Sequence, residues 1–169
     1  MSKAKVAILM GSKNDFVQVK GAAKILKEFG IEFQVRVMSA HRTPKAVQDL
    51  VEGAEKENIK VFIAAAGAAA HLAGVVAAHT TLPVIGIPVE SASLKGMDSL
   101  LSTVQMPGGI PVATVSIGSM GAKNAGLLAV QMLALSDEKL ATDMKQYRAD
   151  MAIKIASDDS DLQAEVDAL

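Results

Sequence analysis

The sequence contains no cysteine and no tryptophan, and its aromatic residues are one tyrosine and four phenylalanines. Without cysteine the chain has no disulfides, no thiolate metal ligands and no cysteine nucleophile. So few aromatic rings argue against a surface that stacks nucleic-acid bases or a flavin. The three histidines occur without an H-E-x-x-H pattern, so we expect no metal site. A serine in a G-x-S-x-G turn is also missing, which leaves acyl-enzyme chemistry without support.

Neither sign of charge is in excess in this chain. The 17 lysines and arginines are matched by 18 aspartates and glutamates, which gives a formal net charge of −1. A protein that binds nucleic acid or an anionic membrane would need a basic excess, so we expect neither partner. No run approaches the roughly 18 apolar residues of a membrane span, and the N-terminal apolar run is too short for a signal peptide. We therefore expect a cytoplasmic protein.

Small aliphatic residues are what the chain has in abundance. Hydrophobic residues make up 50% of the sequence, and the mean hydropathy is +0.31. A chain of 169 residues is long enough for one domain with a sizeable core. We expect a single domain over residues 1–169, with a core over about 5–135 and a C-terminal helix and tail over 136–169. Because the apolar content is high for one such surface, we expect a homo-oligomer.

Short apolar runs alternate with longer segments of helical period, a pattern typical of a parallel α/β sheet. The runs predict strands over residues 6–10, 31–38, 61–65, 84–87 and 112–116. Helices are predicted over 15–29, 45–57, 66–79, 98–104 and 122–135 and from 136 onward, with a frayed acidic tail from Asp158. These elements fit a flavodoxin-like, doubly wound three-layer sandwich, with a parallel five-stranded sheet in the order 2-1-3-4-5 and a projecting C-terminal helix.

In such a sheet, ligands bind beyond the carboxyl ends of the strands, where the strand order reverses. The loops after the first three strands should therefore meet around one crevice. Each of these loops carries polar side chains of the kinds that bind ligands or move protons. They are Ser12, Asn14 and Asp15 in the first loop, Ser39, His41 and Arg42 in the second, and His71, after Gly67, in the third.

The first loop, residues 11–15, lies between a strand and a helix N-terminus, where free N–H groups and the helix dipole favour an anion. The pattern is neither G-x-G-x-x-G nor a Walker loop, and Ser12 or Asn14 serving only as a helix cap explains it equally well. Asp15 is harder to explain by helix capping alone, because a carboxylate beside an anion site is unfavourable unless it accepts hydrogen bonds. The two hydroxyls of a ribose supply them.

The second loop holds the most informative residues. Arg42 offers a planar fork suited to a phosphate, and His41 can gain and lose a proton near neutral pH. The alternative is a solvated loop whose arginine pairs with a nearby acid. Thr43 followed by Pro44 predicts a helix that starts here, with the threonine as its cap.

The third segment, residues 66–70, consists of small side chains that could line a dry cleft or simply permit close packing of a helix on the sheet. Nothing in the segment itself decides between the two. His71, which follows it, is expected to position other groups rather than to act as a catalyst.

Four motifs in order, over about Lys5 to Arg148, resemble the N5-carboxyaminoimidazole ribonucleotide mutase family of bacterial purine synthesis, class I. They are G-S-x-x-D, S-A-H-R-T-P, A-G-x-A-A-H-L-x-G and D-S-L-L-S-T-V-Q-M-P-G-G-I-P-V-A-T-V-S-I-G. The resemblance implies a flavodoxin-like octamer, with a last helix that reaches a neighbouring subunit and active sites at subunit contacts. It also implies an activity without ATP, metal or organic cofactor, and a functional link to an ATP-dependent carboxyaminoimidazole ribonucleotide synthetase.

The implied reaction moves a carboxylate from the exocyclic N5 of the ribonucleotide to ring carbon C4. By resemblance, Ser12, Asn14 and Arg42 would hold the 5′-phosphate, and Asp15 would bind the ribose hydroxyls. This remote binding energy would fix the imidazole ring at the reacting end of the site.

At the reacting end, His41 would carry a proton to the nitrogen of the departing carbamate and remove one from C4. Ser39 and His71 would orient the carboxylate or the ring. A tight cleft would keep CO₂ beside C4 until the new bond forms. We expect Ala66, Gly67, Ala68, Ala69 and Ala70 to form that cleft, with Leu72 also in contact with the substrate.

Three residues depart from the family pattern: Asn14 replaces a usual Ser, Ala68 the second Gly of A-G-G-A-A-H-L-P-G, and Ala73 its Pro. Two other functions remain open. The first is a carboxylase that adds CO₂ directly to aminoimidazole ribonucleotide, as in the second class of the family. The second is a module that senses such nucleotides without converting them.

Overall fold

The computed structural model describes residues 6–91 and 93–169. The first residues of the predicted domain lie outside this part, including Lys5, where the predicted core and the resemblance begin. The described strands form a five-stranded parallel sheet in the order β2-β1-β3-β4-β5, which confirms the predicted order and fold class. They are β1 (Val6–Met10), β2 (Phe33–Val37), β3 (Val61–Gly67), β4 (Val84–Val89) and β5 (Ala113–Thr114).

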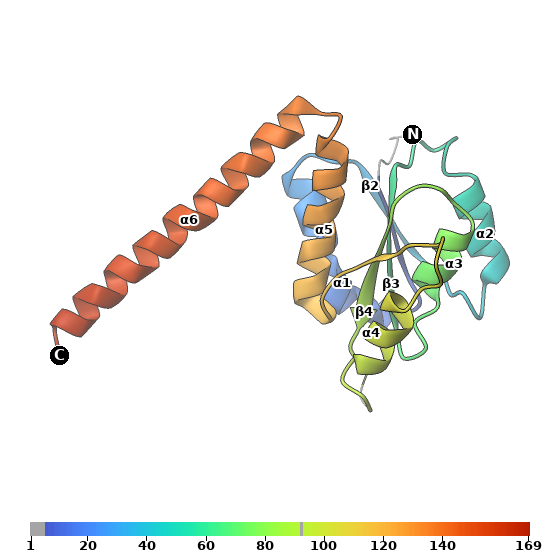
Figure 1. Cartoon of the computed structure of the whole chain (residues 1–169), viewed down its shortest axis with the longest axis horizontal. Coiled ribbons are helices and arrows are strands. Elements are labelled where there is room, and N and C mark those ends of the chain that lie inside the picture. The colour runs from blue at the N-terminus through green and yellow to red at the C-terminus, as the bar shows by residue number, and fades with distance from the viewer. Residues whose placement is uncertain (1–5, 92) are drawn as a thin grey trace.

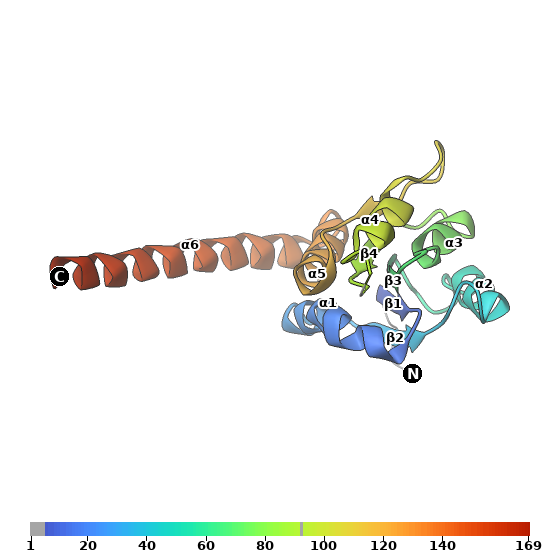
Figure 2. The same ribbon diagram turned by 90° about the horizontal axis from the view of Figure 1, so that it is seen from below.

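Helices cover both faces of the sheet, which gives the predicted three layers (Figure 1, Figure 2). α1 and α5 pack on one face, and α2, α3 and α4 pack on the other. After a 3-10 turn, η1 (Lys13–Asp15), the helices are α1 (Phe16–Glu28), α2 (Pro44–Glu52), α3 (Leu72–Ala78), α4 (Met97–Val104), α5 (Gly118–Ala134) and α6 (Glu138–Asp167).

The central strands explain why apolar runs predicted this sheet so well. Along β1, Val6, Ile8 and Met10 belong to the core under α1 and α5, whereas Ala7 and Leu9 belong to the core under α2 and α3. A parallel strand covered on both faces has no polar side, so it reads as a continuous apolar run. The carboxyl ends of β1, β2 and β3 therefore lie at one edge of a rigid, buried sheet.

Three predicted helix boundaries before the last helix are wrong, and one of them is the start of α5, which lies at Gly118 and not at 122. α2 ends at Glu52, before the poor helix former Gly53, and residues 53–58 form turns that close at Asn58 with a left-handed φ of 57°. Residues 66–71 do not open a helix either: β3 runs on through Gly67, and α3 begins only at Leu72. Between them Ala68 has a φ of 52°, which no right-handed helix contains.

The last helix differs most from expectation, because the tail predicted to be frayed from Asp158 is helical through Asp167. Neither glycine nor proline occurs in this stretch, so nothing in the sequence stops the helix. Near its start, Leu140 and Met144 are buried against the core, and the remainder projects away from the body as a long arm (Figure 1, Figure 2). Neither this helix nor another within 6–91 and 93–169 is both long and apolar enough to cross a membrane.

Candidate active site

The loop after β1 turns sharply at Ser12. The Oγ of Ser12 accepts a hydrogen bond from the N–H of Asn14 at 3.2 Å, and the N–H of Ser12 donates to Asp15 Oδ2 at 2.9 Å. This reciprocal pair is a capping box, so the helix-cap interpretation of the loop is correct for Ser12. Ser12 and Asp15 nevertheless both line the same cleft, whereas Asn14 is exposed and is not part of the cleft wall as described.

Asp15 sits in a partly buried position at the floor of this loop. Burial raises the pKa of its carboxyl above the ordinary value, and the Ser12 N–H and the Arg42 guanidinium act in the opposite direction. A carboxylate that has lost part of its water in this way gains from new hydrogen-bond donors. The hydroxyls of a sugar are donors of the right kind.

The loop after β2 is fixed by hydrogen bonds among its own residues. The N–H of Ser39 donates to Thr43 Oγ1 at 2.9 Å, and the Ser39 Oγ accepts from the N–H of Arg42 at 3.1 Å. Thr43 stands at the predicted cap position before Pro44, but its hydroxyl bonds the backbone of Ser39 and not the first turn of α2. The threonine therefore shapes the loop rather than caps the helix.

Arg42 joins the first two loops. Its Nη2 donates to the carbonyl oxygen of Gly11 at 2.7 Å, and its Nε donates to Ser39 Oγ at 3.4 Å. A guanidinium has five N–H donors in a fixed plane, so these two bonds orient the group and leave further donors for an anion. The alternative prediction, pairing with a nearby acid, is not what the geometry shows: Arg42 bonds a backbone carbonyl and a serine, with Asp15 as a coulombic neighbour.

His41 and His71 come from different loops and meet directly. The Nε2 of His41 lies 2.7 Å from the Nδ1 of His71, and the rings make an edge-to-face pair at an angle of 80°. One nitrogen must donate and the other must accept, so the contact holds a single proton. His71, predicted to have a positioning role, is in place to orient His41.

The third loop brings the backbone itself to the cleft. Gly67 ends β3, and a Cβ placed on it would lie 3.4 Å from the carbonyl oxygen of Val89, in ordinary van der Waals contact. Ala68 adopts the left-handed φ of 52° and turns the chain, after which the N–H of His71 donates to the carbonyl oxygen of Ala69 at 2.8 Å. The positive φ explains why the resembling family usually has a glycine at this position.

The three loops enclose one cleft of about 400 Å³. The sequence predicted this wall except for Gly11 and Ala40, and it also predicted Ala68 and Ala70, which are not part of the wall. A neighbouring hollow of about 360 Å³ shares Ser12 and Arg42 and adds Lys13, a cation that loop position alone could have suggested. The cleft wall consists of Gly11, Ser12, Asp15, Ser39, Ala40, His41, Arg42, Ala66, Gly67, Ala69, His71 and Leu72.

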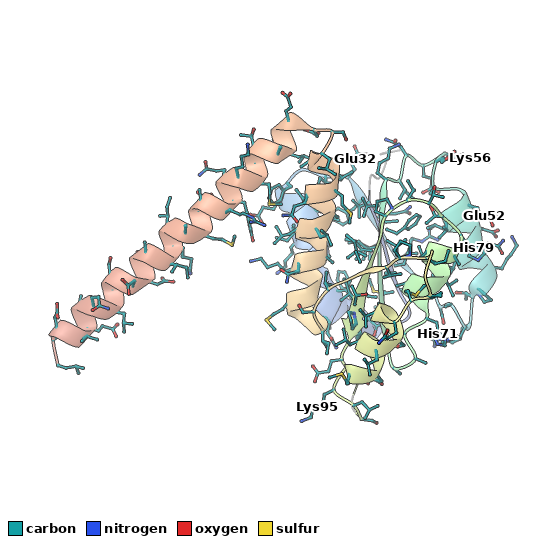
Figure 3. All side chains as sticks on the ribbon, in the orientation of Figure 1. Glu32, Glu52, Lys56, His71, His79 and Lys95 are labelled. Carbon is teal, nitrogen blue, oxygen red and sulfur yellow. The ribbon has the colours of Figure 1, made fainter. Side chains whose placement is uncertain are left out.

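Other parts of the molecule offer less chemistry. A larger groove of about 620 Å³ lies between α5 and α6, but it is walled mainly by long apolar side chains with Lys123 and Arg148. Within the described residues, no three His, Asp or Glu side chains are grouped so as to hold a metal ion. His71 lies towards the end of the molecule where Lys95 and α4 lie, while His79 lies near Glu52 at the other end (Figure 3). The polar side chains suited to binding and proton transfer are therefore those in the cleft formed by the loops after β1, β2 and β3.

Comparisons with known proteins agree on one relationship. Residues 5–154 match the model of a family described as AIR carboxylase. The N5-carboxyaminoimidazole ribonucleotide mutase of Saccharolobus solfataricus is 54% identical over 153 residues, which cover 90% of this chain and 96% of that protein. The mutase of the same name from Bacillus subtilis is 56% identical over 143 residues, 85% of this chain and 88% of that one. The crystal structure of Treponema denticola PurE has a TM-score of 0.84 and 37% identity, covering 93% of this chain and 97% of that chain.

Proposed function

The chain belongs to the AIR carboxylase family, and from this membership we propose that it is an N5-carboxyaminoimidazole ribonucleotide mutase, an isomerase of purine biosynthesis. The observation that carries the proposal is the convergence of three loops on one cleft, with His41 Nε2 2.7 Å from His71 Nδ1 at its wall. Relatives more than 50% identical over most of their length carry this name.

The end of the cleft near Ser12 and Arg42 binds the 5′-phosphate. Arg42 supplies planar N–H donors that its bonds to Gly11 and Ser39 already orient. Lys13, beside Ser12 and Arg42 in the adjoining hollow, adds positive charge. Asn14 contributes to phosphate binding indirectly: its backbone N–H donates a hydrogen bond to the Ser12 hydroxyl and so orients that group.

Asp15 binds the ribose hydroxyls. Its carboxylate has one oxygen committed to the N–H of Ser12, and its burial leaves it short of water. Hydrogen bonds from a cis-diol would repay that lost hydration. Because phosphate and ribose are held away from the reacting atoms, their binding energy serves to fix the imidazole ring opposite His41.

His41 moves the proton that the reaction requires. The N5–carboxylate bond breaks and releases CO₂, and a protonated His41 gives its proton to N5. Carbon C4 then attacks the retained CO₂ and becomes tetrahedral, and the now neutral His41 removes the C4 proton to restore aromaticity. The net change transfers one carboxylate from N5 to C4 and regenerates the histidine.

His71 and Ser39 orient the groups around this step. The close His41–His71 contact restricts the His41 ring, and Ser39 lies in the same loop as His41 and bonds Arg42. Small side chains at Ala66, Gly67 and Ala69, with Leu72 behind them, form an apolar wall that limits the escape of CO₂. The Ala68 methyl group is not part of that wall as described, so the departure at this position leaves room for the carboxylate.

We further propose a cytoplasmic homo-octamer with active sites at subunit contacts. Its support is apolar surface outside the cleft: on α6, Ile153 and Ile155 are each 67% exposed, and on α4, Leu101 is 51% exposed. Covering such faces by neighbouring subunits removes apolar surface from water. Mass measurement in solution gives the subunit number directly. The functional link to the synthetase that makes the substrate is a proposal that follows from the reaction.

A second candidate is direct carboxylation of aminoimidazole ribonucleotide by CO₂, favoured by the description of the matching family as AIR carboxylase. The purified protein should be assayed with N5-carboxyaminoimidazole ribonucleotide, and with aminoimidazole ribonucleotide plus bicarbonate. Mutase function predicts rapid conversion of the first without bicarbonate. Conversion only with bicarbonate would assign the carboxylase. Binding without single-turnover conversion of either nucleotide would assign a sensing module.

A further inference from the structure

Ser102 of α4 connects that helix to the turn between β3 and α3. Its Oγ accepts a hydrogen bond from the N–H of Ala70 at 3.1 Å and lies 3.2 Å from the carbonyl oxygen of Ala68. The same oxygen lies 2.7 Å from the carbonyl oxygen of Asp98, one helical turn earlier. The hydroxyl proton is shared between these carbonyls, while the lone pair that accepts from Ala70 is always available. One hydroxyl thus contacts both ends of the turn.

This turn needs outside support. Ala68 has a φ of 52°, a left-handed conformation that glycine adopts freely and that a residue with a Cβ resists. Ala70 is 1% exposed, so its N–H requires a partner inside the protein, and Ser102 provides it. The Ser102 hydroxyl therefore stabilises a turn that its first residue, Ala68, disfavours.

The orientation of α4 makes this tie hard to replace by packing. Its buried side chains are Ser99 at 0% and Thr103 at 2% exposure, whereas Met97 and Leu101 are 52% and 51% exposed. The helix thus turns hydroxyl groups towards the sheet and apolar groups outward, the reverse of an ordinary surface helix. The helix is therefore attached to the turn by hydrogen bonds, and Ser102 makes them.

We propose that Ser102 is a positioning residue for the reaction, because it holds the Ala68–Ala70 turn that sets where His71 meets His41. The turn leads directly into His71, whose N–H bonds Ala69 and whose Nδ1 lies 2.7 Å from His41 Nε2. The inference rests on the proposed mutase function for its kinetic test. Ser102 itself contacts neither histidine. It acts through the backbone of the Ala68–Ala70 turn, which leads into His71.

The kinetic test compares three variants of the full-length chain. Ser102→Ala should lower kcat about tenfold and leave KM within about twofold, because the phosphate and ribose contacts are on other loops. Ser102→Thr retains the hydroxyl and should recover kcat to within about threefold of the unchanged enzyme. Thr103→Val is the matched control: it removes a buried hydroxyl of the same helix that bonds only within α4, to the Ser99 carbonyl, and should stay within about twofold.

A measurement on the resting protein separates this proposal from the proposed function. A ¹⁵N–¹⁵N coupling across the hydrogen bond between His41 Nε2 and His71 Nδ1 should be present in the unchanged chain and in Thr103→Val, and lost in Ser102→Ala. If the unchanged protein converts no nucleotide, the mutase proposal fails while this readout still decides the role of Ser102. A retained coupling between the two rings in Ser102→Ala, a kcat within twofold of the unchanged enzyme, or a KM that rises as much as kcat falls would each overturn the positioning role.

A second background guards against a variant that folds poorly. In Ala68→Gly the turn adopts its left-handed conformation without strain, so adding Ser102→Ala should cost about threefold in kcat rather than tenfold. The double variant should also regain thermal stability relative to Ser102→Ala alone. An equal loss of kcat in both backgrounds would show that Ser102 does not act by holding this turn.

Discussion

The two ends of the cleft are built in different ways. At the end formed by the loops after β1 and β2, each loop is closed by a hydrogen bond of its own, from the Ser12 N–H to Asp15 and from the Ser39 N–H to Thr43, and Arg42 donates to Gly11 across the two loops. After β3 the wall is made of small residues on a strained turn, and its side-chain support comes from α4. Redundant bonds make the first end tolerant of single losses. The second end has few such hydrogen bonds, and it holds His71 against His41. Small changes there should therefore alter the rate of reaction more than the affinity for the nucleotide.

The largest effect should come from the reacting end, with His41→Asn. Loss of the proton-transfer group is expected to lower kcat by about 10²–10⁴-fold, while nucleotide affinity changes little, because the phosphate and ribose contacts remain. Steady-state kinetics and equilibrium binding of the product nucleotide measure the two quantities. His79→Asn, near Glu52 at the far end of α3, is the matched control and should leave both unchanged. A kcat near that of the unchanged enzyme would remove His41 from the mechanism.

The next largest effect should come from the binding end, with Arg42→Ala. Removing a charged, bidentate donor to phosphate should raise KM about 10–100-fold and change kcat much less. Arg36→Ala removes an exposed arginine from β2, away from the cleft wall, and serves as the comparison. An unchanged KM in Arg42→Ala would place the phosphate elsewhere, and an equal fall in kcat would erase the proposed division between the two ends.

Asp15→Asn should give a smaller loss of affinity and a gain in stability. The amide oxygen can still accept from the Ser12 N–H, but it binds ribose hydroxyls less strongly, so KM should rise about three- to tenfold. Because burial raises the folded-state pKa of this carboxyl, the folded protein binds its proton more tightly than the unfolded chain does. Its contribution to stability is therefore lost as pH rises through the folded pKa.

Thermal unfolding of Asp15→Asn and the unchanged protein at a series of pH values tests that sign. The variant cannot ionise at this position, so its Tm relative to the unchanged protein should increase as pH rises from acid to neutral. A relative Tm that falls over this range would mean that hydrogen bonds to the carboxylate outweigh its burial. The control is Asp158→Asn, on the exposed part of α6, for which no such trend is expected.

Thr43→Val should have the smallest effect of these changes. It removes the hydroxyl that bonds both the N–H and the carbonyl of Ser39, but the bonds from Arg42 to Ser39 and Gly11 remain. We expect KM to rise about two- to fivefold. Thr142→Val, which removes an exposed hydroxyl bonded within α6, provides the baseline. A loss as large as that of Arg42→Ala would show that the binding end is not redundantly held.

Much of the sheet could be predicted because β1, β3 and β4 are covered on both faces and therefore read as unbroken apolar runs. The strand order then brought the loops with Asp15, Arg42 and His71 to one edge. Helix ends were harder: Gly53 stops α2, and nothing stops α6 at the acidic Asp158, because local charge says little about a helix without glycine or proline.

Side-chain geometry in the cleft was beyond sequence reasoning. Asn14 was placed correctly in its loop, but the capping box between Ser12 and Asp15 turns the backbone so that its side chain is exposed. The contact between His41 and His71 joins residues of two loops and depends on the left-handed turn at Ala68. A left-handed alanine and a supporting hydroxyl from α4 leave no periodic pattern in the sequence.

The most direct test is a crystal structure of the protein with the product nucleotide bound. The account predicts the 5′-phosphate within hydrogen-bond distance of Arg42 and the backbone near Ser12, and the ribose hydroxyls on Asp15. It also predicts ring carbon C4 within proton-transfer distance of a nitrogen of His41. A nucleotide in the groove between α5 and α6, or one in the cleft with its imidazole turned away from His41, would contradict it.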